Sequence, residues 1–270
     1  MEPRLQRVEP DQFSFPSPLF ETPPPIQYST TYLSNLWRTT VNIYNEARAC
    51  NDDFKDENTW MSVVTSVLKS AIEYTDPDSD PDDDCEPLML NVQSFQTQPI
   101  SSSLFPTHTS TSFTKTADLA LAFSLSHPEM LRALDPIHTR YPELGLSQME
   151  DAYTMRFPLV AGVEVKERGG SYNEATVQLG VWCAARLEKS RRLREEGQQK
   201  RTREGTETDG PPREVEAEGE GELPPFVGWT VVGHEWKLHV VWKDRSGNVD
   251  LGGYQMQGRE AILRSWYYWH

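Results

Sequence analysis

The segment from Phe157 to Lys166 constrains the fold of this chain more than any other. It is an almost continuous apolar run with a charged end, Glu164-Val165-Lys166, and two glycines follow at positions 169 and 170. A short apolar run bounded by turn residues predicts a strand that is covered on both faces. The next segment, Asn173 to about Arg194, has apolar residues at helical spacing and predicts a helix. The chain therefore requires a sheet with helices packed against it.

The same two periodicities predict the remaining elements. Apolar residues at three- and four-residue spacing predict helices over Thr31–Ala49, Glu57–Ile72, Pro128–Leu134 and Arg259–Trp269, and Asp56 can cap the second. Alternating or short apolar runs predict strands over Leu88–Phe95, Thr116–Phe123, Phe226–Val232 and Glu235–Trp242. The fold class is therefore α/β (α+β), a central mixed β-sheet flanked by helices.

Aromatic residues on the apolar stripes are expected in the core. In the last predicted strand, large apolar residues occupy alternate positions, which predicts that this face is buried. By the same reasoning four tryptophans are more typical of the core than of a platform that stacks on bases: Trp182, Trp229, Trp236 and Trp242. His234 lies between two predicted strands and is interpreted as a turn residue.

Three segments lack the apolar residues that a core requires. Residues 1–30 are rich in proline and are expected to be a disordered tail ahead of one domain over residues 31–270. Residues 76–86 crowd seven acidic side chains around two prolines. A metal site is conceivable there, but the spacing lacks the pattern of a calcium loop and favours a solvated acidic loop. Residues from about 195 to 225 are expected to be a charged, flexible insertion.

The acidic charge of the chain is concentrated at its beginning. The formal net charge is −15; residues 1–90 hold 17 acidic and 6 basic side chains, a net of −11, and residues 91–270 hold 24 and 20, a net of −4. A strongly acidic body would repel a polyanion, whereas acidity confined to a tail and a loop need not. The lack of a concentrated basic face still argues against tight binding of nucleic acid.

Cysteine content and hydropathy indicate an intracellular protein, nuclear or cytoplasmic. The three cysteines form no CxxC pair, which is typical of a reducing compartment. Neither a signal sequence nor a membrane span is apparent, so no membrane partner is expected. The basic residues between Arg191 and Arg203 could form a nuclear-import signal, although interleaved glutamates favour a solvated helix end.

Three charged residues combine into a possible metal centre. Side chains two apart on a strand share a face, so Glu164 and Lys166 project together. Asp118 precedes the apolar run 119–123, where a buried carboxylate is costly without a metal ion or a partner. Two carboxylates with a backbone carbonyl suit Mg²⁺ or Mn²⁺. Taken alone, Glu164 and Lys166 would be interpreted as a surface ion pair, and the second such pair, Glu235 and Lys237, as a solvated face.

These residues resemble the signature of the PD-(D/E)xK nuclease superfamily, and within it a nuclease-like family of fungal proteins. The similarity consists of Asp118, Glu164-x-Lys166 and a helix that carries Gln178, and it extends to Glu57 ahead of Trp60, to Gln178–Trp182 and to Gly233–Trp236. Ala117 replaces the proline that the superfamily name includes. The resemblance implies a restriction-endonuclease-like core.

The resemblance also implies roles for individual residues. Asp118 and Glu164 would bind Mg²⁺ (or Mn²⁺) with help from the Val165 carbonyl, and Lys166 would orient the attacking water. Glu57 would lie at the rim of the site. Gln178 would support it from the helix, although by itself it is more often an ordinary helix-surface residue.

Two functions of different classes follow. The first is a divalent-metal-dependent nuclease that hydrolyses phosphodiester bonds of nucleic acid, with DNA as the favoured substrate. The second is a catalytically inactive protein-interaction module with the same fold and a protein partner. A scaffold without any site is least favoured, because it leaves the charged strand ends unexplained.

Overall fold

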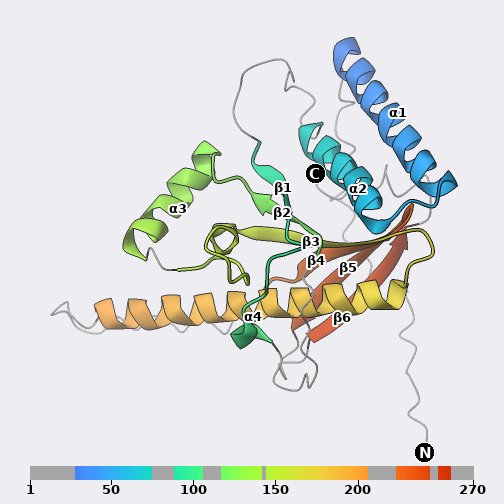
Figure 1. Ribbon diagram of the computed structural model, residues 1–270. Helices are drawn as coiled ribbons and strands as arrows, with labels where there is room; N and C mark the ends of the chain where they lie inside the picture. The colour runs from blue at the N-terminus through green and yellow to red at the C-terminus, as the bar shows by residue number, and fades with distance from the viewer. Residues whose placement is uncertain are drawn as a thin grey trace, which may run out of the picture.

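The computed structural model describes residues 28–74, 88–105, 117–141, 144–205, 223–243 and 249–256 (Figure 1). Most of the predicted tail, the acidic loop at 76–86, residues 206–222 of the predicted insertion and the predicted helix Arg259–Trp269 lie outside the described residues. In the described ranges no helix combines the length and the apolar character needed to cross a membrane.

Six strands of the described part of the chain form one mixed sheet in sequential order. They are β1 (Leu90–Ser94), β2 (Leu119–Phe123), β3 (Leu159–Lys166), β4 (Phe226–Val232), β5 (Glu235–Lys243) and β6 (Val249–Met256). Strands β3 and β4 are parallel, and every other neighbouring pair is antiparallel. The parallel pair follows from the long helix between these strands, because parallel neighbours need a crossover connection. The predicted mixed sheet is confirmed.

The described residues form four α-helices: α1 (Thr30–Asp52), α2 (Glu57–Glu73), α3 (Pro128–Arg140) and α4 (Tyr172–Gly205). Two 3₁₀ turns, η3 (Ser102–Leu104) and η4 (Thr154–Arg156), lie in the loops. Helix α4 crosses one face of the sheet, while α2, backed by α1, lies on the other (Figure 1). The predicted cap of α2 is confirmed: the Asp56 carboxylate accepts a hydrogen bond from the Thr59 amide at 3.0 Å.

Two apolar cores lie on opposite faces of the sheet, and β3 contributes to both. Val163 and Val165 pack with Trp60 on the α2 side, whereas Leu179 and Trp182 belong to the core on the α4 side. A Cβ atom at Gly162 would lie 2.6 Å from the Trp182 ring, so the helix can approach β3 this closely only over a glycine. Because side chains alternate between the two faces along β3, Glu164 and Lys166 project from the same face as Gly162.

Strand β5 corrects the prediction about its buried face. Val241 is fully buried and His239 is 3% exposed, whereas Trp242 is 39% exposed, so Trp242 is not a core residue. Trp236 and Leu238, on the predicted face, are partly buried against the core on the α2 side, but the fully buried face is that of Val241, because α4 covers it. Strand β6, which is missing from the prediction, pairs with β5 along its whole length. Its two central glycines weaken the strand signal in the sequence.

Helix bounds also differ from the prediction. Helix α4 continues to Gly205, so the first part of the predicted insertion is helical, and α3 extends to Arg140. The apolar stripe predicted on α1 is largely exposed in the described structure: Leu33 is 48% exposed, Trp37 70% and Tyr44 63%. The residues of α1 that are buried are instead Tyr32 and Cys50.

Candidate active site

The antiparallel pairing of β2 with β3 brings Asp118 to the charged end of β3. Leu119 is opposite Val163, so Asp118, one residue earlier, reaches the last residues of β3. Its Oδ2 accepts a hydrogen bond from the Val165 amide at 2.8 Å. Two residues 47 positions apart in the chain are thereby joined. In a strand the amide and carbonyl of one residue point to the same side. The Val165 carbonyl therefore also faces the side of Asp118.

Glu164 and Lys166 form a buried ion pair on the α4 face of β3. Lys166 Nζ donates to Glu164 Oε1 at 2.9 Å, and Lys166 is 5% and Glu164 1% exposed. Lys166 Nζ also lies 3.3 Å from Oε2 of Glu57, the first residue of α2. The carboxylate of Glu57 is more accessible than the others, with 36% of its side chain exposed. The ammonium group is thus held between a buried and a rim carboxylate.

Burial and mutual repulsion disfavour the charged forms of the two carboxyl groups in this cluster. Burial, and after it the charge of the nearby Asp118, raise the pKa of Glu164 to about 8 against the attraction of Lys166. Burial also raises the pKa of Asp118, against the hydrogen bond from the Val165 amide and the charge of Lys166. Burial alone would lower the pKa of Lys166, but Glu164, Glu57 and Asp118 together raise it. Both carboxylates therefore gain from an additional cation.

Gln178 stands behind the cluster and not in it. It is 7% exposed, and its Nε2 donates to Glu174 Oε1 at 3.0 Å on the same helix. It precedes Trp182, which covers Gly162, by one turn, and so lies toward the end of β3 where Glu164 is found. No hydrogen bond joins Gln178 to Asp118, Glu164 or Lys166, all of which are described. The Oε1 atom of Gln178 is buried and has no partner among the described residues.

Sequence reasoning missed Gln96. This residue follows β1, whose end is tied to β2 by a hydrogen bond from the Phe95 amide to the Asp118 carbonyl at 2.9 Å. The side chain of Gln96 lowers the pKa of the Asp118 carboxyl group, a smaller effect than burial, and its Nε2 donates to Asn58 Oδ1 at 3.5 Å. A glutamine in a turn carries no recognisable signal, and only the pairing of β1 with β2 places it beside Asp118.

The donor set of the cluster fits a hard divalent cation. Glu164 Oε2 is buried with no hydrogen-bond partner among the described residues, and Asp118 has a second oxygen, Oδ1, besides the one bonded to the Val165 amide. Carboxylate and carbonyl oxygens are the ligands that Mg²⁺ and Mn²⁺ prefer. In the described ranges no three His, Cys, Asp or Glu side chains are grouped closely enough to hold a metal ion. The fit therefore rests on the carboxylates of Asp118 and Glu164 and on the Val165 carbonyl, because Glu57 forms an ion pair with Lys166.

The sheet is mixed and has flanking helices. Its inner strand β3 ends in Glu-x-Lys, and Asp118, directly before the neighbouring strand β2, lies beside this end. These features define an α/β protein of the restriction-endonuclease-like class. The family model described as PD-(D/E)XK nuclease superfamily matches residues 4–260, and the chain belongs to this superfamily. The match begins within the predicted N-terminal tail. No curated protein and no solved structure matches the chain.

Proposed function

We propose that this protein is a divalent-metal-dependent nuclease that hydrolyses phosphodiester bonds of nucleic acid, with DNA as the favoured substrate. The observation that carries the proposal is the meeting of Asp118, Glu164 and Lys166 at one end of β3. The Val165 amide donates to Asp118 at 2.8 Å, and Lys166 donates to Glu164 at 2.9 Å. A lone surface ion pair would not need the buried second carboxylate. Membership of the superfamily supports the same chemistry.

The metal site would consist of Asp118, Glu164 and the Val165 carbonyl, with Mg²⁺ or Mn²⁺ as the ion. When bound, the ion would supply positive charge that polarises the phosphate and stabilises the negative charge of the transition state. The chain prepares this site by holding Asp118 through the Val165 amide, and Glu164 Oε2 has no partner among the described residues. The buried position of both carboxylates excludes competing water from their oxygens.

Lys166 would orient the attacking water and offset charge on the scissile phosphate. Its Nζ is fixed by Glu164 at 2.9 Å and by Glu57 at 3.3 Å, so the group is in place before substrate arrives. Glu57 would act at the rim, where it keeps the ammonium directed outward along β3. Gln178, whose Oε1 has no hydrogen-bond partner in the described part of the chain, would support the site from α4.

A catalytically inactive interaction module is the second candidate function. The observation that favours it is the formal net charge of −15, of which −11 falls in residues 1–90, since such charge repels a polyanion. In that case the fold would be kept for binding a protein partner, and the buried ion pairs would serve stability alone.

Cleavage of nucleic acid by matched variants tests the choice. The parent protein is incubated with single- and double-stranded DNA and with RNA in Mg²⁺ and in Mn²⁺. We expect cleavage that falls by about a hundredfold or more in Lys166→Ala and in Asp118→Asn. Lys69→Ala and Asp135→Asn are the controls, because both residues are exposed on helices away from the site, and they should cut like the parent.

Two results would contradict the proposal in different ways. A folded parent that cuts none of these substrates with either ion would favour the interaction module. Cleavage that persists in Lys166→Ala and Asp118→Asn would show that the active site lies elsewhere in the chain.

A further inference from the structure

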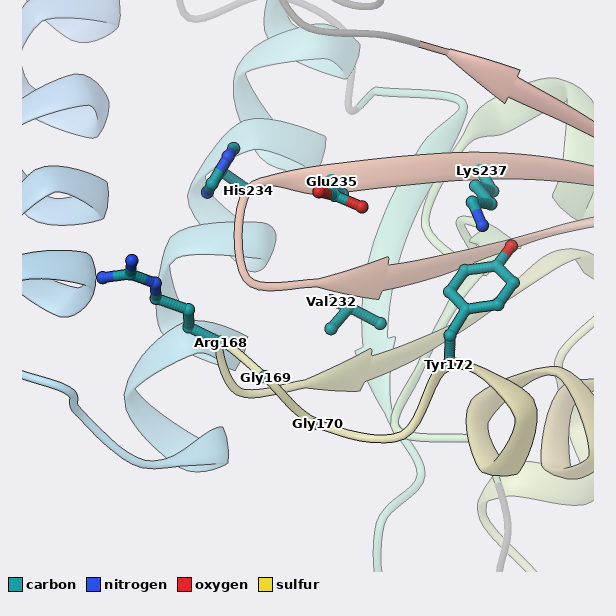
Figure 2. Close-up of a pocket in the computed structure, with 8 residues that line it drawn as sticks. All are labelled: Arg168, Gly169, Gly170, Tyr172, Val232, His234, Glu235 and Lys237. Carbon is teal, nitrogen blue, oxygen red and sulfur yellow. The ribbon is translucent and has the colours of Figure 1, made fainter.

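A pocket of about 420 Å³ lies beside the candidate active site and has no part in the chemistry proposed above. It is formed by the turn that joins β3 to α4 and by the hairpin between β4 and β5 (Figure 2). Its lining includes Gly169, Gly170 and Tyr172 on one side and His234, Glu235 and Lys237 on the other. The sequence indicates only a turn and a solvated pair of charges at these positions.

Lys166 does not line the pocket, but the two segments that form the pocket's walls contact it. The Gly233 amide donates to the Lys166 carbonyl at 2.9 Å, and a Cβ atom at Gly170 would lie 2.8 Å from the Lys166 Cβ. Both walls of the pocket are therefore tied to the last residue of β3. A polynucleotide is a continuous row of phosphates, so a strand that has one phosphate at Lys166 has neighbouring phosphates that this pocket can receive.

Lys237 supplies a fixed positive charge. Its Nζ lies 3.3 Å from the centroid of the Tyr172 ring, toward which it points in Figure 2. Within the described part of the chain no carboxylate lies within ion-pair distance of Lys237, whereas Lys166 has two such partners and Lys243 pairs with Glu188. A cation that rests on a ring face keeps its charge available to an anion.

The ring under Lys237 is itself held rigidly. The Tyr172 hydroxyl accepts a hydrogen bond from Thr230 Oγ1 at 2.8 Å and lies 3.1 Å from His239 Nε2. Thr230 and His239 are both buried in the sheet. Packed strands thus hold the ring on which the Lys237 ammonium group rests. A preformed position for this group lowers the entropic cost of binding.

Backbone groups add to the attraction for an anion. Gly169 has a φ of +83°, and a Cβ atom there would meet nothing within 4 Å, so the turn presents open backbone to the pocket. Helix α4 begins here, with the Ser171 hydroxyl accepting from the Glu174 amide at 3.2 Å. A helix N-terminus favours negative charge, in addition to the charge of Lys237.

Arg168 also lines the pocket, but its guanidinium group makes its contacts outside it. Its Nη1 donates to the Asn51 carbonyl at 3.0 Å, and its guanidinium lies 5.2 Å from the Phe54 ring, so it points away toward the turn between α1 and α2 (Figure 2). The charges of Lys237 and Glu235 cancel in sum, and the positive charge that remains at the edge of the pocket is that of Arg168. This balance suits the single negative charge of a phosphodiester better than the double charge of a terminal phosphate.

We propose that this pocket binds a phosphodiester of the substrate strand adjacent to the one that is cleaved, with Lys237 as its main cationic contact. The inference rests on the proposed nuclease function and adds the path of the strand, which runs from Lys166 across the turn at Gly169 and Gly170. Lys237 is a binding residue here and takes no part in the hydrolysis.

The test compares Lys237→Gln with Lys69→Gln, which removes an exposed lysine near the end of α2 opposite to Glu57. Binding of a labelled DNA oligonucleotide is measured in Ca²⁺ over a range of salt concentrations. Loss of one phosphate contact should weaken binding about five- to tenfold and reduce the salt slope by about 1. Lys237→Arg should restore the slope, and Lys69→Gln should leave it unchanged. In cleavage assays Lys237→Gln should raise KM with little change in kcat.

Single methylphosphonate substitutions locate the contact. In the parent, one uncharged position next to the cut should weaken binding, and in Lys237→Gln the same position should have no further effect. Equal affinity and salt slope in Lys237→Gln and the parent would overturn the inference. If the parent still cleaves DNA in that case, the proposed nuclease function stands. Dependence on a 5′-phosphate instead of an internal position would also overturn it. A parent that neither binds nor cuts any oligonucleotide would remove both proposals together.

Discussion

At the scale of single residues, the candidate site is a balance between burial and charge. Glu164 is 1% exposed, and its second oxygen has no partner in the described structure. A buried carboxylate next to another carboxylate is costly, and one ammonium group cannot neutralise both. Lys166 offsets part of this cost through its contact with Glu164, and a bound cation would offset the rest. The strongest consequence of the proposed site is therefore a link between metal binding and folding.

Metal binding should stabilise the parent protein independently of any cleavage. At an Mn²⁺ concentration of about 100 times its Kd, a ligand that binds only the native state adds about 2.7 kcal/mol to the free energy of unfolding. We expect this gain in the parent, and a loss of most of it in Asp118→Asn, measured by thermal or denaturant unfolding with and without EDTA.

Asp135→Asn serves as the matched control for this measurement, because Asp135 is exposed on α3. Its stability should respond to Mn²⁺ as the parent does. An equal stabilisation of Asp118→Asn would place the ion elsewhere, and no stabilisation of the parent would argue against a metal centre.

At the scale of elements, the site depends on how closely α4 lies on β3. The closest approach is at Gly162, where the Trp182 ring takes the space of a side chain. Gly228 on β4 makes a similar approach to Leu179, where a Cβ atom would lie 2.8 Å from Leu179 Cδ1. The two glycines are directly paired in the parallel part of the sheet, so α4 rests on a flat surface two strands wide.

Gly162→Ala should destabilise the protein by about 1–3 kcal/mol, because the added methyl group would lie 2.6 Å from Trp182 and 3.3 Å from Leu179. Chemical denaturation measures the change. The displaced helix should also weaken cleavage by moving the α4 end that carries Gln178.

Gly180→Ala is the control for this substitution. Gly180 lies on α4 with its nearest neighbour, Leu251 Cδ1, at 3.7 Å from the position of a Cβ atom, which is an ordinary contact. Alanine is the better helix former, so Gly180→Ala should stabilise by up to about 1 kcal/mol. If both alanine variants had the same stability, the contact at Gly162 would not be the tight one that the geometry indicates.

At the scale of the whole molecule, the distribution of charge limits how strongly a polyanion can bind. Residues 91–270 carry a net charge of −4, compared with −11 for residues 1–90. The pocket next to Lys166 contains one lysine without a carboxylate partner among the described residues. A nuclease with this charge pattern would depend on local contacts and a metal ion more than on long-range attraction.

Neutralising the acidic segment should therefore increase binding to nucleic acid. We expect a variant with asparagine at the five aspartates of residues 78–84 to bind DNA more tightly than the parent at low salt. The difference should shrink as salt rises, because exposed charges are screened beyond about 10 Å at 0.1 M ionic strength. Fluorescence anisotropy across a salt series measures both effects, and equal affinities at low salt would show that the segment does not act on the bound strand.

Much of the fold could be predicted because its signals are local. The cap of α2, the periodicity of α2 and α4, and the apolar run of β3 depend on residues that are near neighbours in the chain. Strand β6 and the exposure of Trp242 could not be predicted in this way, because they depend on which strand pairs with β5 and which helix covers it. Gln96 was missed for the same reason.

The sequence by itself determined the alternation that sets Glu164 and Lys166 on one face of β3, and the chemical types available for a site. Only the tertiary structure decided that Asp118 meets the Val165 amide at 2.8 Å and that Glu57 reaches Lys166. It also decided that Gln178 makes no hydrogen bond to Asp118 or Lys166. It also decided the raised pKa of Glu164 and the pocket at Lys237. Face alternation follows from the geometry of one strand, whereas distances and burial between distant segments follow from how strands pair and helices pack.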